Sequence, residues 1–145
     1  MTRPTWDETW LNVCEEMARR STCTRRQVGA VVVDGNRLIS SGYNGAPPLQ
    51  PHCIDGACPR GRLTGALPED YEKYPCIAVH AEANALLRAG RDAENAVLYC
   101  TDRPCLQCQN LIMAAGIFLV VWPELRLLIP IKFIQWFPQD EGLLK

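Results

Sequence analysis

The chain has 145 residues, a size typical of one domain with its own hydrophobic core. Its 15 basic and 16 acidic residues leave a formal net charge of −1. Proteins that bind long nucleic acids usually carry a basic patch or stripe, so this balance argues against a nucleic-acid partner and favours a small-molecule ligand. We expect residues 1–145 to form a single domain.

The N-terminal sequence MTRPTWDE lacks the apolar stretch of a signal peptide, so we expect a cytoplasmic protein. In that compartment the eight cysteines indicate metal binding or catalysis before disulfides. The apolar region at residues 117–137 is not expected to span a membrane. It is interrupted by Pro123, Glu124, Arg126, Pro130 and Lys132.

The first predicted element is an amphipathic helix at residues 5–20, which opens with a capping-box pattern at Thr5 and Glu8. A β-hairpin is predicted next, because two β-branched or apolar runs flank the turn Asp34-Gly35-Asn36. The loop that follows contains Asn44, whose side-chain amide can serve turn geometry or bind a ligand.

Residues 46–76 are irregular in pattern and long for a loop, and we expect them to form an insertion in the domain. A metal clip would keep such a segment ordered. The candidate ligands for a second metal are Cys23, Cys53, Cys58 and Cys76, with His52 as a substitute. The alternative is that these cysteines are free and pack as small apolar side chains.

A metal-binding pattern begins with His80-Ala81-Glu82 and continues with Pro104-Cys105-Leu106-Gln107-Cys108. One imidazole and two thiolates are one ligand fewer than a closed structural zinc site needs, so water can occupy the fourth position. Glu82 is placed to move protons on that water. H-x-E followed by P-C-x-x-C is the signature of zinc deaminases that act on cytosine or adenine. Taken alone, C-x-x-C is also found in redox pairs and in structural zinc sites.

The elements around this pattern are helix, strand, helix and strand. A helix is predicted at residues 80–89 and a buried strand at 96–101. The second helix has Pro104 in its first turn, with Cys105 and Cys108 on one face of that turn, and a strand follows at 118–122. Cys100 is expected in the core. Together with the hairpin, this order predicts a layered α/β domain with a mixed sheet. Residues 131–137 are expected to add a strand or pack against another subunit.

Several segments resemble the deoxycytidylate (dCMP) deaminase family of the cytidine deaminase-like superfamily. The resemblance covers approximately residues 5–122, and the segments that carry it are STCTR (21–25), VGAV (28–31), SGYNG (41–45), HCID (52–55), VHAEANA (79–85) and PCLQC (104–108).

The resemblance implies a three-layer fold with a central sheet of about five strands flanked by helices. It also implies a homo-oligomer, commonly a hexamer, and sugar binding by Asn44. Several family members hold a second zinc ion on cysteines that match the four named above. Many are activated by dCTP and inhibited by dTTP through a site built partly on residues 42–45.

Two stretches depart from the family pattern. Asp102-Arg103 stands before Pro104 where an uncharged residue is more common, so Arg103 is either a new substrate contact or a surface charge. The tail after Trp122 also differs.

The phosphate of a nucleotide needs cationic or backbone donors. Of the candidates Arg25, Arg26, Arg60, Arg62 and Arg103, we favour Arg25 and Arg26.

The resulting hypothesis is Zn²⁺-dependent hydrolytic deamination of dCMP to dUMP, with release of ammonia. His80, Cys105 and Cys108 are expected to hold the metal, Glu82 to transfer protons, and the backbone at Ala81 to contact the ring. CMP or a 5-substituted dCMP is an alternative substrate. A non-catalytic zinc module that holds an interaction surface is the alternative from another class.

Overall fold

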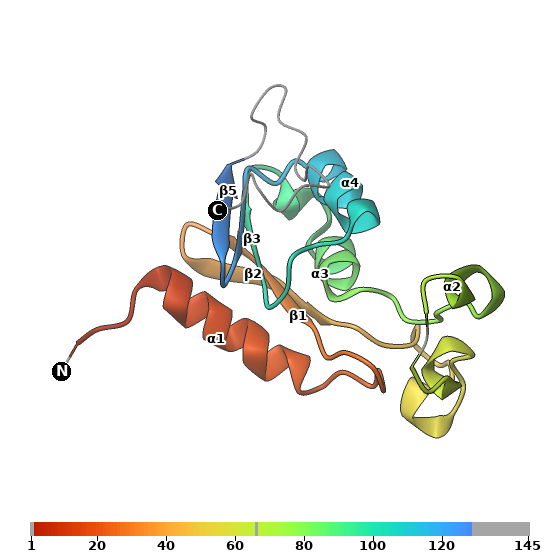
Figure 1. Ribbon diagram of the computed structural model, residues 1–145. Coiled ribbons are helices and arrows are strands. Elements are labelled where there is room, and N and C mark those ends of the chain that lie inside the picture. Colours follow the sequence, from red (N-terminus) through yellow and green to blue (C-terminus); the bar gives the residue numbers. More distant parts are fainter. Residues whose placement is uncertain (1, 66, 129–145) are drawn as a thin grey trace.

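A mixed five-stranded sheet with strand order β2-β1-β3-β4-β5 forms the centre of the protein. The structure, a computed structural model, describes residues 2–65 and 67–128 (Figure 1). The strands are β1 (Gly29–Asp34), β2 (Arg37–Tyr43), β3 (Val97–Cys100), β4 (Leu119–Trp122) and β5 (Leu125–Leu128). β1 pairs antiparallel with β2 and β3, β3 pairs parallel with β4, and β4 pairs antiparallel with β5. The mixed character of the sheet is as the order of elements predicted, and its number of strands agrees with what the family resemblance implied.

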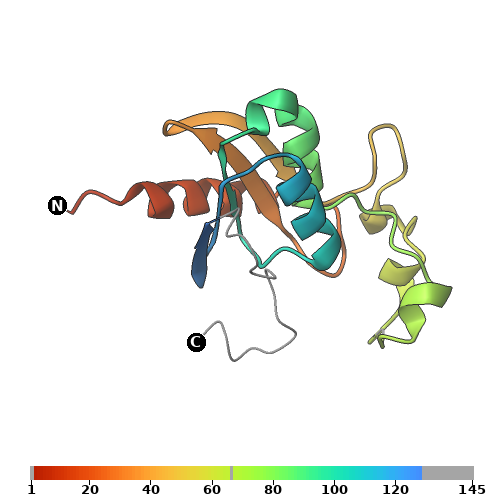
Figure 2. The same cartoon turned by 90° about the horizontal axis from the view of Figure 1, so that it is seen from above.

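Helices cover both faces of this sheet. Helix α1 (Trp6–Ala18) packs on one face, where its Cys14 joins a buried cluster with Val31 and Val33. Helices α3 (Ala81–Ala89) and α4 (Leu106–Ala114) cover the other face, where Val32 and neighbouring side chains are buried. Alternate residues of β1 therefore face opposite helical layers, as the period of a strand requires. Figures 1 and 2 show the resulting three layers, which confirm the predicted α/β class.

The predicted N-terminal elements form for the reasons that the sequence suggests. The side chain of Thr5 accepts a hydrogen bond from the Glu8 backbone at 3.1 Å, and the Glu8 carboxylate accepts one from the Thr5 backbone at 2.6 Å. This capping box starts α1 at Trp6. In the hairpin turn, Gly35 and Asn36 have φ of 53° and 58°, the left-handed values that a two-residue hairpin turn of type I′ needs.

The segment predicted as an insertion lies at one side of the layers (Figure 2) and contains three short helical turns. They are η1 (Cys53–Asp55), η2 (Arg60–Arg62) and α2 (Asp70–Lys73). A bridge between Gly45 and Val79 closes the base of the segment, through hydrogen bonds of 3.2 and 2.8 Å in the two directions. The chain therefore leaves the sheet and returns at neighbouring points, directly before His80.

The second half of the chain departs from the sequence predictions at the start of α4 and at β5. Helix α4 begins at Leu106, so Pro104 precedes the helix instead of occupying its first turn. Strand β5 was not predicted, because the turn at Pro123 and Glu124 lacks the glycine or asparagine that marks a hairpin. The strand expected at residues 131–137 lies outside the described residues. Among the residues described, no helix is long and apolar enough to cross a membrane.

Candidate active site

The N-terminal ends of α3 and α4 meet at the predicted metal site. His80 is the N-cap residue of α3 and Cys105 is the N-cap residue of α4, while Cys108 lies in the first turn of α4. Both caps have extended backbone angles, so their side chains project from the helix ends. Two helix dipoles thus place partial positive charge at this point, which favours thiolate ligands.

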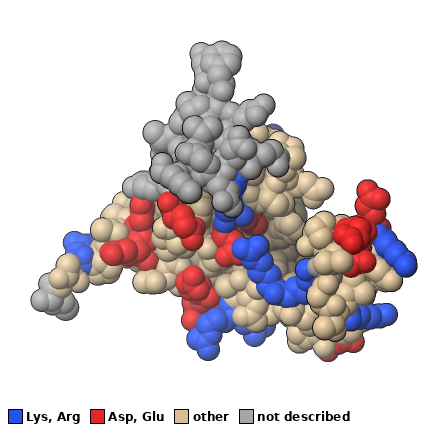
Figure 3. Space-filling model, viewed as in Figure 1, with Lys and Arg blue, Asp and Glu red and all other residues tan. Residues whose placement is uncertain are grey.

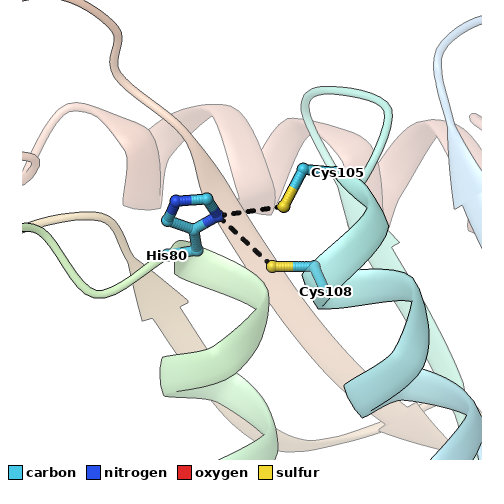
Figure 4. A group of neighbouring side chains, drawn as sticks. All are labelled: His80, Cys105 and Cys108. Carbon is cyan, nitrogen blue, oxygen red and sulfur yellow. Dashed lines mark hydrogen bonds between the residues drawn. The ribbon is translucent and has the colours of Figure 1, made fainter. Parts of the chain in front are cut away.

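The spacing of these three side chains fits zinc. Nδ1 of His80 lies 3.4 Å from Sγ of Cys105 and 3.3 Å from Sγ of Cys108, as Figure 4 shows. All three ligand atoms lie within 4.8 Å of one another. Zinc bonds of about 2.0–2.1 Å to nitrogen and about 2.3 Å to sulfur, at tetrahedral angles, place nitrogen and sulfur about 3.5 Å apart. The residues present therefore match a tetrahedral metal with three protein ligands.

The charges around Cys108 also require a cation. Burial raises the pKa of this thiol, and the negative charges of Glu82 and Cys105 raise it further. Two thiolates and a carboxylate held this close repel one another in a buried setting. A divalent cation is attracted to all three groups, so metal binding and thiol ionisation are coupled here.

Glu82 lies beside the metal ligands and does not belong to the three-ligand group. Its side chain is 4% exposed, and Oε2 accepts a hydrogen bond from Sγ of Cys108 at 3.7 Å. Burial is the main cause of the raised pKa of this carboxyl. A carboxyl that exchanges a proton more readily near neutral pH is suited to acid and base chemistry.

Close packing between β2 and α3 fixes the position of Glu82. A Cβ atom on Gly42 would lie 2.4 Å from the backbone oxygen of Ala81 and 2.6 Å from the backbone nitrogen of Ala85. Only glycine permits this approach. Ala81 itself is fully buried between His80 and Glu82, so the helix start has no room to shift.

A cavity of about 370 Å³ opens beside the metal ligands. It is bordered by His80, Glu82 and Cys105, and by every residue predicted to contact substrate: Asn44, Ala81, Arg25, Arg26 and Arg103. Of the remaining phosphate candidates, Arg60 borders it as well, whereas Arg62 is used in a hydrogen bond to the backbone oxygen of Gly56. Figure 3 shows basic side chains gathered between the body of the molecule and the insertion. The cavity thus joins a metal-binding end to an arginine-rich wall.

The side chain of Asn44 is hydrogen-bonded to the backbone of the segment that contains Arg26 and Val28. Its Oδ1 accepts from the Val28 backbone at 2.8 Å, and its Nδ2 donates to the backbone oxygen of Arg26 at 2.7 Å. The side chain of Arg26 in turn donates from Nε to Oδ2 of Asp102 at 2.5 Å. Asp102 lines the cavity but was not predicted as a site residue, and only its unusual place before Pro104 drew attention to it.

Arg60 links two parts of the insertion to each other. It donates from Nε to the backbone oxygen of Tyr74 at 2.9 Å and from a terminal nitrogen to that of Tyr71 at 2.6 Å. Its guanidinium also lies 4.2 Å from the centre of the Tyr71 ring, a cation–π distance. These contacts make Arg60 a structural residue of the cavity wall.

The four cysteines predicted for a second metal all border the same cavity. The thiols of Cys53 and Cys76 lie near enough to that of Cys58 to influence its pKa, and Cys23 raises the pKa values of Cys53 and Cys76. This cluster is looser than the first, since in the described part of the chain only the His80 group brings three ligand atoms within 4.8 Å. His52 is exposed and lines a separate surface pocket with Gly42 and Arg88.

A three-layer α/β fold with a His-Cys-Cys group at two helix ends and a buried glutamate beside it defines a zinc-dependent deaminase of the cytidine deaminase-like class. Comparison with known families agrees. Residues 4–123 match the family model described as the cytidine and deoxycytidylate deaminase zinc-binding region. The chain belongs to this family.

Individual relatives are similar over most of the chain. A deoxycytidylate deaminase of Mycobacterium phage D29 is 50% identical over 129 residues, which cover 86% of this chain and 98% of the phage protein. A deoxycytidylate deaminase of Schizosaccharomyces pombe is 43% identical over 122 residues, covering 83% of this chain but 37% of the yeast protein. A crystal structure of dCMP deaminase from cyanophage S-TIM5 with dCMP and dUMP has a TM-score of 0.64 and 26% identity, covering 84% of this chain and 83% of that one.

Proposed function

We propose that this protein catalyses the hydrolytic deamination of dCMP to dUMP, with release of ammonia. The observation that carries the proposal is a three-ligand metal group with buried Glu82 beside it, at one end of an arginine-lined cavity. The family match and the deoxycytidylate deaminase relatives support the same reaction.

His80, Cys105 and Cys108 hold the zinc ion in this proposal, and the ion supplies a water whose pKa falls from 15.7 to about 7. Glu82 would accept one proton from the attacking water and deliver it to N3 of the cytosine ring. It would then accept the remaining proton of the hydroxyl added at C4 and deliver it to the amine, so that the C4–N bond breaks, ammonia leaves and the C4 carbonyl forms. Its burial excludes solvent from these transfers. The backbone at Ala81, at the start of α3, is placed to hydrogen-bond the base.

The arginines account for the nucleotide part of the substrate. Arg25, Arg26 and Arg103 border the cavity, and a guanidinium is the preferred partner of a phosphate. Asn44 also borders the cavity and is proposed to contact the sugar through the hydrogen-bonding capacity that remains to its amide. In this proposal the base lies at the metal ligands, the phosphate at the arginines and the sugar between them.

The substrate is tested by ammonia release from purified, zinc-loaded protein with dCMP, CMP, deoxycytidine and 5-substituted dCMP. We expect dCMP to have the highest kcat/KM. A higher value for CMP or a 5-substituted dCMP would replace the proposed substrate by that nucleotide. Zinc binding without turnover of any of the four would support the non-catalytic zinc module instead.

We also propose a second, structural Zn²⁺ on Cys23, Cys53, Cys58 and Cys76. Burial raises the pKa of Cys58, but hydrogen bonds from the Ile77 and Gly61 backbone, together with those to the Cys53 and Cys76 side chains, leave this pKa lowered. A thiol that ionises readily among three others is a good zinc ligand. Metal analysis should give two zinc ions per chain, and one in the Cys58→Ser variant. One zinc ion in the unmodified protein would contradict the second site.

Assembly, regulation and location are further proposals. We infer a homo-oligomer, a hexamer by family resemblance, which sedimentation velocity tests. Activation by dCTP and inhibition by dTTP are expected at the loop of residues 42–45, and initial rates at sub-saturating dCMP test both. A single domain over residues 1–145 predicts one cooperative unfolding transition. A cytoplasmic location is tested by cell fractionation.

A further inference from the structure

We propose that Asp102 is a positioning residue that acts through Arg26, fixing the guanidinium that receives the 5′-phosphate of the substrate. The proposal rests on the proposed function, because it assumes a nucleotide in the cavity. It deepens that function by choosing one of the bordering arginines as the phosphate contact and by naming the group that holds it in place.

Arg26 is held at both its backbone and its side chain. Its backbone oxygen accepts the hydrogen bond from Asn44 Nδ2 at 2.7 Å, and its Nε donates to Asp102 Oδ2 at 2.5 Å. Asn44 is itself 8% exposed and tied to the backbone of Val28. The backbone and the guanidinium of Arg26 are therefore both attached to the cavity wall.

The attachment leaves the phosphate-binding part of Arg26 available. A guanidinium carries five N–H groups, and the contact through Nε uses one, so the two terminal nitrogens keep the fork that binds a phosphate. The Arg26 side chain is 72% exposed, and without Asp102 it would sample many rotamers that binding would have to restrict. The side chain of Asp102 is 22% exposed, and its ion pair with Arg26 limits these rotamers before the substrate binds.

The other arginines of the wall have different geometry. Arg60 is committed to the backbone of Tyr71 and Tyr74. Arg25 has its guanidinium 5.7 Å from the centre of the Tyr71 ring, so it faces the insertion. Arg26 is connected by its ion pair with Asp102 to the loop that leads to the metal ligands Cys105 and Cys108.

Asp102 does not repel a phosphate strongly enough to oppose this role. The residues bordering the cavity include Glu82 and Asp102 against four arginines: Arg25, Arg26, Arg60 and Arg103. The wall therefore keeps a positive excess towards an anionic ligand. Asp102 also lies three residues before Cys105, so the ion pair sets the separation between the phosphate contact and the metal ligands.

The test compares Asp102→Asn with the unmodified protein on two substrates. For dCMP we expect KM to rise about fivefold with kcat within about twofold, because the lost contact positions the phosphate ligand and not the reacting groups. For deoxycytidine, which has no phosphate, kcat/KM should not change. Asp102→Glu, which keeps the charge, should restore most of the loss in KM. The exposed Asp92→Asn on the surface is the control.

A double-mutant cycle tests whether Asp102 acts through Arg26. Arg26→Gln should raise KM for dCMP by more than Asp102→Asn does, and adding Asp102→Asn to it should have no further effect. An equal additional loss in the Arg26→Gln background would overturn the proposal. So would an equal loss with deoxycytidine, which would indicate a structural role for Asp102.

Calorimetric binding provides a readout that does not depend on turnover. The affinity for dUMP should fall about fivefold in Asp102→Asn, while deoxyuridine binds the two proteins equally. An unchanged affinity for dUMP would refute the positioning role. If the unmodified protein binds dUMP but releases no ammonia from dCMP, the proposed function fails, and this binding comparison still decides the role of Asp102.

Discussion

Replacing Glu82 by glutamine separates metal binding from proton transfer at this site. Glutamine has the same shape as glutamate, so the 4% exposed pocket of Glu82 should accept it without repacking. The three metal-binding atoms belong to His80, Cys105 and Cys108, so zinc content should stay the same. Removing a buried ionisable group should also leave the free energy of unfolding unchanged or higher.

The expected loss of activity follows from the role of this carboxyl. A positioned acid or base contributes roughly 10²–10⁴-fold to the rate, which is about 3–5 kcal/mol of activation free energy. Because Glu82 is proposed to move protons on the water, on N3 and on the amine, we expect kcat for dCMP to fall near the upper end, about 10⁴-fold.

The assay is the initial rate of ammonia release at saturating dCMP, with zinc measured in the same samples. Glu15→Gln, an exposed glutamate on α1, is the matched control and should keep full activity. Zinc retention with kcat reduced less than tenfold in Glu82→Gln would refute the acid–base assignment. Loss of zinc would show instead that Glu82 is needed to hold the metal.

Three further predictions test the metal, the packing and the titration of the core. Cys105→Ser should lose zinc and activity together, whereas Cys100→Ala, buried in the β3 core, should keep its zinc; equal zinc loss in both would contradict the ligand assignment. Gly42→Ala should lower the free energy of unfolding by about 1–3 kcal/mol in denaturant titrations, because its Cβ would meet backbone atoms of α3 that cannot move aside. Burial raises the pKa of the Cys14 thiol from 9.0 to about 12, so the stability that depends on its protonated form is complete below pH 9 and is lost as the pH rises towards 12. Relative to Cys14→Ala, the unmodified protein should lose about 2 kcal/mol between pH 9 and about pH 10.5, and parallel pH profiles would contradict this.

The parts of the fold that local sequence patterns control were predictable. The capping box at Thr5, the Asp34-Gly35-Asn36 turn and the buried runs of β3 and β4 are decided by nearby residues, and each forms close to its expected bounds. The grouping of His80, Cys105 and Cys108 was predictable for a different reason. Zinc chemistry restricts the residue types so strongly that the sequence pattern predicts a candidate metal site before the fold is known.

Features that depend on contacts between distant segments could not be predicted. The bond from Arg26 to Asp102 joins residues 76 positions apart, and neither shows a periodic pattern. The hydrogen bond from the Val28 backbone to Asn44 likewise depends on the pairing of β1 with β2, which brings the two residues together. Similarly, α2 has four residues and is held by Arg60, so its own sequence has little helical signal.

The bridge between Gly45 and Val79 joins the two ends of the insertion independently of the residues between them. Because the two ends of the insertion are joined there, its length affects stability only through loop closure, and doubling it costs roughly 0.6 kcal/mol. Residues of the insertion other than its cysteines and Arg60 can be exchanged or extended while His80, directly after the bridge, keeps its place. A designer wishing to retarget this scaffold to a bulkier nucleotide can therefore begin with the insertion and leave the sheet untouched.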